Sequence, residues 1–246
     1  MSGGAGRRRA FGRRGFVRVC AGGMLGAGSG LLAGCGAKGG GTVDRARAHG
    51  VPPAGPAAAW RELAAGNERW RTLHEQHPGE SRAVRRSLLG GQHPFAVVLG
   101  CIDSRVPPEL VFDQGLGDLL TVRSAGEVLD EAVLGSISYG VLELAVPLVV
   151  VLGHQGCGAV RAAAEADRDA DRLPVHVRYL AQQIRPVLDR TLTGDARVDA
   201  AVTANVRRIT ARLTAEPDLA VRIAAGTLNV IGARYELTSQ RVHRIH

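Results

Sequence analysis

The chain has 246 residues, enough for one large domain or two small ones. With 45% apolar and 22% charged residues and no long apolar run free of glycine, it is neither disordered, nor collagen-like, nor a multi-span membrane protein. Most of the net charge of +8 comes from six arginines in residues 1–35, and only 4% of residues are aromatic, which argues against nucleic-acid binding.

Residues 1–35 have the pattern of an export signal, with a basic start followed by a glycine-rich, weakly apolar stretch too short to span a membrane. Arg13-Arg14-Gly15-Phe16-Val17-Arg18 resembles the twin-arginine motif, and Leu32-Ala33-Gly34-Cys35 resembles the bacterial lipobox. We expect export to the bacterial cell envelope and lipidation at Cys35, on the outer side of the cytoplasmic membrane or in the periplasm. The alternative is a disordered basic segment with an incidental Leu-Ala-Gly-Cys.

Residues 36–56 are rich in glycine and proline and predict a linker, so the folded domain is expected over 57–246. This domain shows no internal repeat. It opens with a helical pattern over 57–73, and a second short helix is expected over 81–89. Trp60 and Trp70 on the first helix are expected to anchor the core or a subunit interface.

Two short apolar runs, 95–100 and 148–153, end in glycine and predict strands buried on both faces. Between them, 119–122 predicts a third strand and 130–145 a helix. This alternation predicts an α/β fold with a central, mostly parallel sheet flanked by helices. The later elements expected are helices over 156–166, 175–190 and 197–214, and strands over 228–232 and 241–245 that could pair as a hairpin.

Reactive residues follow two of these strands. Cys101 comes directly after the first, and His154 directly after the second, with Cys157 three residues later. In open parallel sheets, ligands bind off the carboxyl ends of strands, so these side chains can converge. Two sulfurs and one nitrogen suit tetrahedral zinc, and three protein ligands leave a fourth position open, as in catalytic zinc sites. The alternatives are a disulfide between the two cysteines, inert buried thiols and an ordinary core histidine.

Asp103 and Arg105 alternate with Cys101 along an extended turn. Asp103 could be a fourth zinc ligand, or could accept a hydrogen bond from a group at the fourth position. Arg105 can hold the carboxylate by a two-point fork. The alternative for this pair is a surface ion pair.

The segments Cys101-Ile102-Asp103-Ser104-Arg105 and His154-Gln155-Gly156-Cys157-Gly158 resemble the two-part signature of the β-class carbonic anhydrases. The resemblance extends over about residues 57–246. It implies an α/β enzyme, a homodimer or larger assembly, whose N-terminal helical arm wraps the partner subunit. It also implies that the three ligands bind Zn2+, and that a zinc-bound hydroxide interconverts carbon dioxide and bicarbonate. Asp103 and Arg105 match the family's dyad, which orients the hydroxide or gates the fourth position.

The resemblance also assigns residues around the substrate. Gln92, nine residues before Cys101, matches a glutamine that hydrogen-bonds the substrate. Leu120 and Tyr139 fall where the family lines the pocket with bulky side chains. A backbone amide near Gly158 is a second candidate donor for the developing carboxylate.

Three positions depart from the family pattern. Glu127 replaces a common asparagine, which could alter the cleft rim or a subunit contact. Gln155 replaces the common serine after the ligand histidine. Val98 replaces a tryptophan that some bacterial members carry at an inhibitory bicarbonate site, and we therefore expect an open, water-bound zinc rather than one closed by Asp103.

Two other functions suit the same residues. One is hydrolysis of carbonyl sulfide or carbon disulfide on the same scaffold, and the other is zinc binding by a non-catalytic lipoprotein. Retention of Asp103, Arg105 and Gln92 favours an enzyme, because a binding protein needs none of them. We expect no nucleic-acid partner, and membrane contact only through the lipid anchor.

Overall fold

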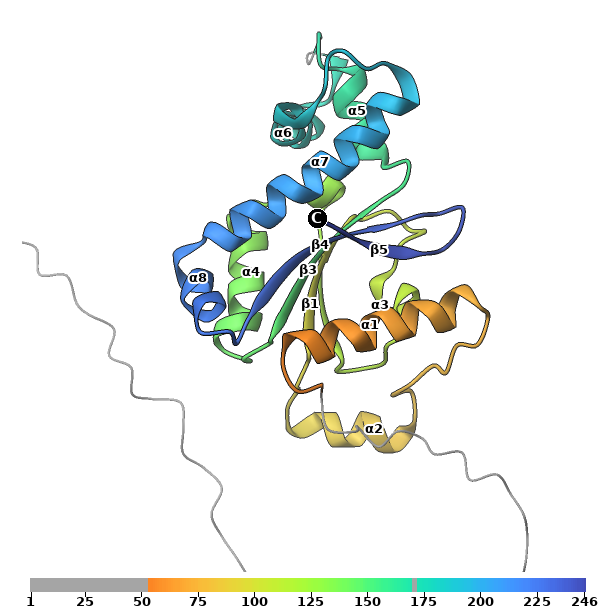
Figure 1. The fold of residues 1–246 in the computed structure, drawn as a ribbon, viewed down its shortest axis with the longest axis vertical. Helices are drawn as coiled ribbons and strands as arrows, with labels where there is room; N and C mark the ends of the chain where they lie inside the picture. The colour runs from red at the N-terminus through yellow and green to blue at the C-terminus, as the bar shows by residue number, and fades with distance from the viewer. Residues whose placement is uncertain (1–52, 170–171) are drawn as a thin grey trace, which may run out of the picture. The chain divides into compact units, whose positions relative to one another are not determined.

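A five-stranded sheet forms the centre of the computed structural model, which describes residues 53–169 and 172–246 (Figure 1). The strands are β1 (Ala96–Gly100), β2 (Leu119–Arg123), β3 (Leu148–His154), β4 (Asn229–Tyr235) and β5 (Val242–Ile245). Their order is β2-β1-β3-β4-β5, in which β5 alone is antiparallel to its neighbour. The predicted mostly parallel sheet and the late hairpin are therefore confirmed.

Helices precede, connect and follow these strands. They are α1 (Pro56–Arg71), α2 (Arg82–Ser87), α3 (Pro108–Val111), α4 (Glu131–Leu142), α5 (Gly158–Glu165), α6 (Val175–Ile184), α7 (Gly194–Ala215) and α8 (Pro217–Ala224). Short 3-10 turns cover Leu88–Gly90, Ala125–Glu127 and Arg185–Val187. The export signal with Cys35, and the linker up to residue 52, lie outside the described residues.

Two helices, α3 and α8, have no counterpart among the elements expected from sequence. Helix α3 is a single turn, too short for a hydrophobic period to show. Helix α8 follows α7 with only Glu216 between them, and it begins at Pro217. Proline lacks the backbone donor that a continuing helix needs but suits the first helical turn, so it ends one helix and starts the next.

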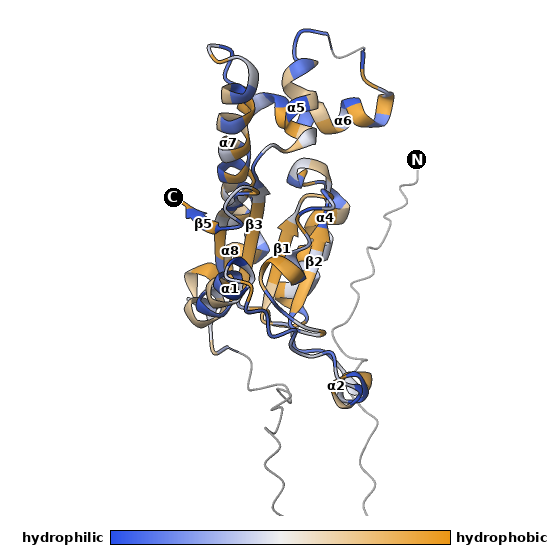
Figure 2. Ribbon diagram, turned by 90° about the vertical axis from the view of Figure 1, so that its right-hand side faces the viewer, coloured by the Kyte–Doolittle hydropathy of each residue, from blue (hydrophilic) through white to orange (hydrophobic). Residues whose placement is uncertain are grey.

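Helices cover both faces of the sheet (Figure 2). Alternate side chains of β1 point to opposite faces, as the two-residue period of a strand requires. Val97 and Leu99 pack with α4, α7 and α8, whereas Ala96 and Val98 pack with α1 and α3. Every residue of β1 and β3 is buried, as the continuous apolar runs predicted.

Apolar and polar side chains both hold the N-terminal helix α1 against this second face. Trp60 and Trp70 pack against the core cluster that includes Leu63, as expected of core anchors. The indole nitrogen of Trp70 donates a hydrogen bond to the Tyr235 hydroxyl, at 3.0 Å. Arg69 forms an ion pair with the buried carboxylate of Asp113, which lies beyond α3. The helical arm is therefore an integral part of the described fold.

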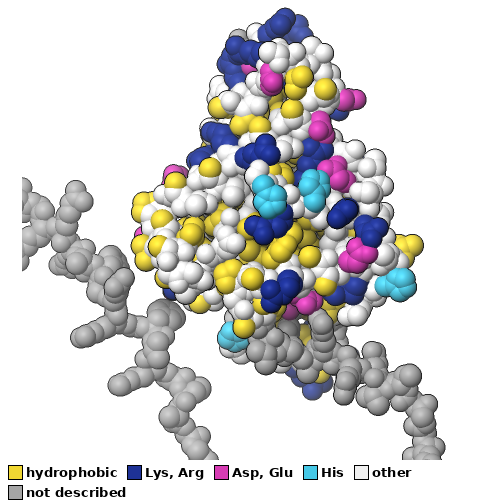
Figure 3. Space-filling view, in the orientation of Figure 1, with side chains coloured by type: hydrophobic (Ala, Val, Ile, Leu, Met, Phe, Trp, Pro, Cys, Tyr) yellow, Lys and Arg dark blue, Asp and Glu magenta, His cyan; other side chains and the backbone are white. Residues whose placement is uncertain are grey.

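Charges are mixed over the surface of the described residues. Figure 3 shows basic, acidic and histidine side chains interspersed over one face, as the small net charge outside residues 1–35 predicts. Within the described segments, no helix combines the length and apolarity needed to span a membrane.

We expect Gly66→Ala to destabilise the fold, because a Cβ on this buried helical residue would overlap the carbonyl oxygen of Phe112. Backbone cannot move aside as a side chain can, so the loss should be about 2–3 kcal/mol in the free energy of unfolding. Urea denaturation measures it. Ala65→Gly, on the exposed side of the same helix, is the control for helix propensity and should cost about 1 kcal/mol. Equal stability of Gly66→Ala and the parent chain would contradict this packing.

Candidate metal centre

The parallel pairing of β1 and β3 brings the two halves of the sequence signature together. Gly100 pairs with Leu152, so Cys101, just after β1, lies beside His154, the last residue of β3. Cys157 stands at the N-terminal boundary of α5. All three side chains are buried, and their candidate ligand atoms lie within 4.8 Å of one another.

The imidazole of His154 is oriented by its own neighbour. Its Nδ1 lies 3.0 Å from the carbonyl oxygen of Gln155, which can only accept, so Nδ1 carries the proton. This leaves Nε2 as a buried acceptor with no hydrogen-bond partner among the described residues. A buried acceptor of this kind is costly unless a ligand satisfies it. A metal ion between Nε2 and the two sulfurs would do so.

The two thiols share one environment. Their sulfurs are 3.8 Å apart and form a hydrogen bond but no disulfide. The backbone amide of Gly126 donates to the Cys101 sulfur at 3.4 Å. The hydrogen bonds from Cys157 and from the Gly126 amide lower the pKa of Cys101, whereas the hydrogen bond to Cys101 and burial raise the pKa of Cys157. A divalent cation replaces the shared proton and ionises both thiols. The donor set of two sulfurs and one nitrogen therefore fits zinc.

Asp103 stands beside this group, and its carboxylate is held by Arg105. The guanidinium donates from Nε to Oδ1 at 2.9 Å and from Nη2 to Oδ2 at 2.7 Å, which is a two-point fork. Arg105 lowers the pKa of the Asp103 carboxyl to about 2, so the group is ionised at neutral pH. Its Oδ2 lies 3.9 Å from His154 Nε2. The carboxylate thus borders the place where a metal ion would keep its open position.

The interpretation of the sequence missed Arg123, the last residue of β2. Its Nε donates to the carbonyl oxygen of Cys101 and its Nη2 to that of Asp103, both at 2.7 Å. One guanidinium therefore shapes the loop that carries the cysteine and the carboxylate. The available signal was an arginine at the end of a strand that pairs with β1.

Glu127 lies in the interior and is only 1% exposed, so it is not on the cleft rim that its sequence position suggested. It ends the 3-10 turn whose Gly126 carbonyl accepts a hydrogen bond from Asn205 of α7, at 2.8 Å. Burial, followed by the nearby Cys101, raises the pKa of the Glu127 carboxyl well above its ordinary value. The residue therefore belongs to the packing beneath the metal centre.

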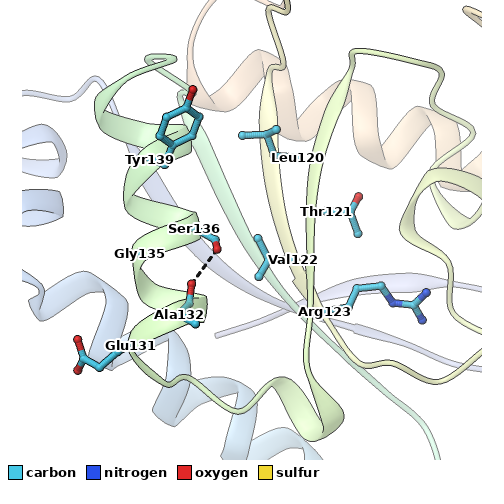
Figure 4. Close-up of a pocket in the computed structure, with 9 residues that line it drawn as sticks. All are labelled: Leu120, Thr121, Val122, Arg123, Glu131, Ala132, Gly135, Ser136 and Tyr139. Carbon is cyan, nitrogen blue, oxygen red and sulfur yellow. Dashed lines mark hydrogen bonds between the residues drawn. The ribbon is translucent and has the colours of Figure 1, made fainter.

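The proposed pocket side chains lie elsewhere in the same chain. Leu120 pairs with Val97, three strand positions or about 10 Å before the level of Gly100. Gln92 precedes β1, at the amino end of the strands. Figure 4 shows Leu120 and Tyr139 at one end of a groove between β2 and α4, with Arg123 toward the other.

Of the four residues expected around the substrate, one therefore lies next to a metal ligand in the sequence and three do not. Gly158 follows Cys157 directly and opens α5, so its amide lies next to a ligand. Gln92 and Tyr139 are exposed, and Leu120 is half-buried. These three assignments remain predictions.

Comparison with known proteins matches this fold and this ligand group. The family model described as carbonic anhydrase matches residues 96–242. Carbonic anhydrase 2 of Mycobacterium tuberculosis (strain H37Rv) is 46% identical over 193 residues, covering 78% of this chain and 93% of the relative. The carbonic anhydrase of Mycolicibacterium smegmatis is 43% identical, covering 78% of this chain and 94% of the relative.

Solved structures agree. The β-carbonic anhydrase CcaA superposes with a TM-score of 0.62 at 25% identity, covering 75% of this chain and 94% of that one. A structure reported among two tetrameric β-carbonic anhydrases of Sordaria macrospora gives a TM-score of 0.59 at 25% identity, covering 77% and 94%. The chain belongs to the carbonic anhydrase family, and its fold is that of the β class.

Proposed function

We propose that this protein is a zinc enzyme that hydrates carbon dioxide reversibly to bicarbonate. The observation that carries the proposal is the buried group of Cys101, His154 and Cys157, with an ionised Asp103 at its border. The curated relatives with more than 40% identity are named carbonic anhydrases, which supports the same reaction.

Zinc held by these residues lowers the pKa of a bound water and so supplies the nucleophile near neutral pH. Asp103 would accept a hydrogen bond from the attacking water, which fixes the direction of the lone pair. Arg105 would keep the carboxylate in that position, because its two-point fork leaves little rotational freedom. An amide at Gly158 would donate to the oxygen of carbon dioxide that gains charge.

The arginine fork also favours the open form of the site. Both carboxylate oxygens of Asp103 are engaged by Arg105, and Oδ1 also accepts from the Arg105 backbone amide at 3.0 Å. A carboxylate with these partners would have to give up strong hydrogen bonds to bind a metal. We therefore propose that water, rather than Asp103, takes the fourth position.

We further propose that a second copy of the chain completes each pocket. Leu120 and Tyr139 lie on the edge strand β2 and on the exposed side of α4, and Gln92 precedes β1 at the amino end of the strands. Tyr139 is 55% exposed. A partner docked on this edge would receive these side chains at its own zinc. The tetrameric solved relatives support an oligomer.

We propose that the N-terminal segment exports the protein to the bacterial cell envelope, where Cys35 carries the lipid anchor. This rests on the order of the twin-arginine-like motif and the lipobox in residues 1–35. The linker that follows would let the folded domain stand away from the membrane surface.

The zinc-loaded protein should hydrate carbon dioxide in stopped-flow measurements, far faster than the zinc-stripped protein. Two thiolates neutralise the formal charge of zinc, so the water is acidified less than by three histidines, and activity should rise from pH 7 to pH 9. Asp103→Asn should lower kcat/KM about 10–100-fold while keeping one zinc per chain.

A pH–rate profile already flat below pH 7 would contradict the charge argument. A chain that binds one zinc but shows no turnover would contradict the proposed reaction. Carbonyl sulfide and carbon disulfide would then be the substrates to assay.

Hybrid dimers test the shared pocket. In a dimer of one Cys157→Ser chain and one Gln92→Ala chain, the intact metal centre belongs to the second chain. If the glutamine comes from the partner, that centre receives an unaltered Gln92, and the hybrid regains about half of the wild-type activity. Co-purification through two different tags isolates the hybrid. A hybrid no more active than the Gln92→Ala homodimer would place the glutamine within its own chain.

Intact mass spectrometry of membrane-extracted protein tests export. The mature chain should begin at Cys35 and carry the added mass of a diacylglycerol group. Cys35→Ser should abolish this mass and the membrane association. A mass that corresponds to an unmodified chain still beginning at Met1 would refute the proposed processing.

A further inference from the structure

The turn that follows the metal-ligand histidine is tied to the β4–β5 hairpin by the side chain of Gln155. Oε1 of Gln155 accepts two hydrogen bonds from Thr238, one from the backbone amide at 3.1 Å and one from the hydroxyl at 3.2 Å. The backbone amide of Gln155 also donates to the carbonyl oxygen of Tyr235, at 2.9 Å. Residue 155 is therefore fastened to the hairpin through its backbone and its side chain.

The same residue supplies the acceptor for the ligand. The carbonyl oxygen of Gln155 lies 3.0 Å from Nδ1 of His154. Partners of this kind set the tautomer and the ring orientation of a metal-binding histidine. Rotation of the peptide that follows Gln155 would move this oxygen, and the hydrogen bonds of Gln155 hold in place the residue from which that peptide extends.

The hairpin is itself anchored to the body of the protein. Asn67 of α1, which is only 4% exposed, donates to the carbonyl oxygen of Gln240 at 3.0 Å. Its Oδ1 accepts from the amide of Val242 at 2.7 Å. Asn67 therefore fixes the C-terminal side of the loop that carries Thr238. The backbone hydrogen bond from Gln240 to the Glu236 carbonyl oxygen closes the loop on its other side.

Side-chain length explains why glutamine stands at this position. Serine carries its oxygen one bond beyond Cβ, whereas the amide oxygen of Gln155 lies three bonds beyond Cβ. A serine at position 155 would leave its oxygen short of Thr238. The departure from the common serine is thus matched by a contact that only a longer acceptor makes.

We propose that Gln155 is a positioning residue of the metal centre: by holding the hairpin, it keeps its carbonyl oxygen on His154 Nδ1 and slows the loss of zinc. The inference rests on the proposed zinc site, but not on the reaction. It acts through His154 and requires no contact with the substrate.

The rate of zinc transfer to a coloured chelator measures this role directly, without carbon dioxide. Gln155→Ala and Gln155→Ser should each release zinc about tenfold faster than the parent chain. Thr238→Ala, which keeps the backbone donor, should accelerate release by a smaller factor, about two- to threefold. In the Gln155→Ala background, Thr238→Ala should have no further effect, because the shared contact is already lost.

A matched control and a stability measurement separate positioning from general damage. Gln182→Ala, an exposed glutamine on α6, should leave zinc release unchanged. The metal-free proteins should all melt within about 2 °C of one another, because exposed hydrogen bonds contribute little to global stability. The d–d absorption bands of the Co2+-substituted protein should shift in Gln155→Ala and not in the control.

If Gln155→Ala released zinc at the same rate as the parent chain, the proposal would be overturned. Independent, multiplying effects of the two substitutions would also overturn it, as would a fall in metal-free melting temperature large enough to account for the faster release. If Gln155→Ala does not fold, parental release by Thr238→Ala would overturn it alone. A parent chain that binds no zinc would refute the metal site itself, whereas zinc binding without hydration of carbon dioxide would refute only the reaction.

Discussion

The side-by-side parallel pairing of β1 and β3 is the constraint on which the rest of the structure depends. Because Gly100 pairs with Leu152, the residues that follow the two strands emerge together, and a cysteine and a histidine more than fifty positions apart become neighbours. A slip of one residue would send every side chain of a strand to the opposite face. Both strands are buried on both faces, so their register is held by two packed helical layers and not by a turn.

Around the ligands, polar side chains form hydrogen bonds with backbone carbonyl oxygens as well as with other side chains. Arg123 binds the carbonyl oxygens of the first ligand loop, and the Gln155 carbonyl oxygen meets His154. Arg105 acts in the same way on the Asp103 carboxylate. Such contacts restrict the orientation of the ligands before a metal arrives, which lowers the entropy that binding must overcome. Nε2 of His154 is buried and has no hydrogen-bond partner among the described residues. A bound metal would satisfy this nitrogen.

The edge of the sheet formed by β2 differs from the region around the ligands because it is open. The strand β2 has no neighbour on its outer side within the described residues, and the groove between it and α4 exposes Tyr139. An edge of this kind is a natural place for another chain to dock. A pocket shared between subunits would couple assembly to activity, because each metal centre would then depend on the partner chain for side chains that line the substrate.

The sequence alone was sufficient for the parallel sheet, the order of its strands along the chain, the three metal ligands and the family. These follow from local patterns: apolar runs, glycine at strand ends and short ligand spacings that chemistry restricts. Only the tertiary structure decided that Glu127 is buried, that Arg123 organises the ligand loop, and that Leu120 and Tyr139 lie away from their own metal centre. Those facts depend on which surfaces meet across long sequence separations, and side-chain spacing along one strand or helix carries no information about that.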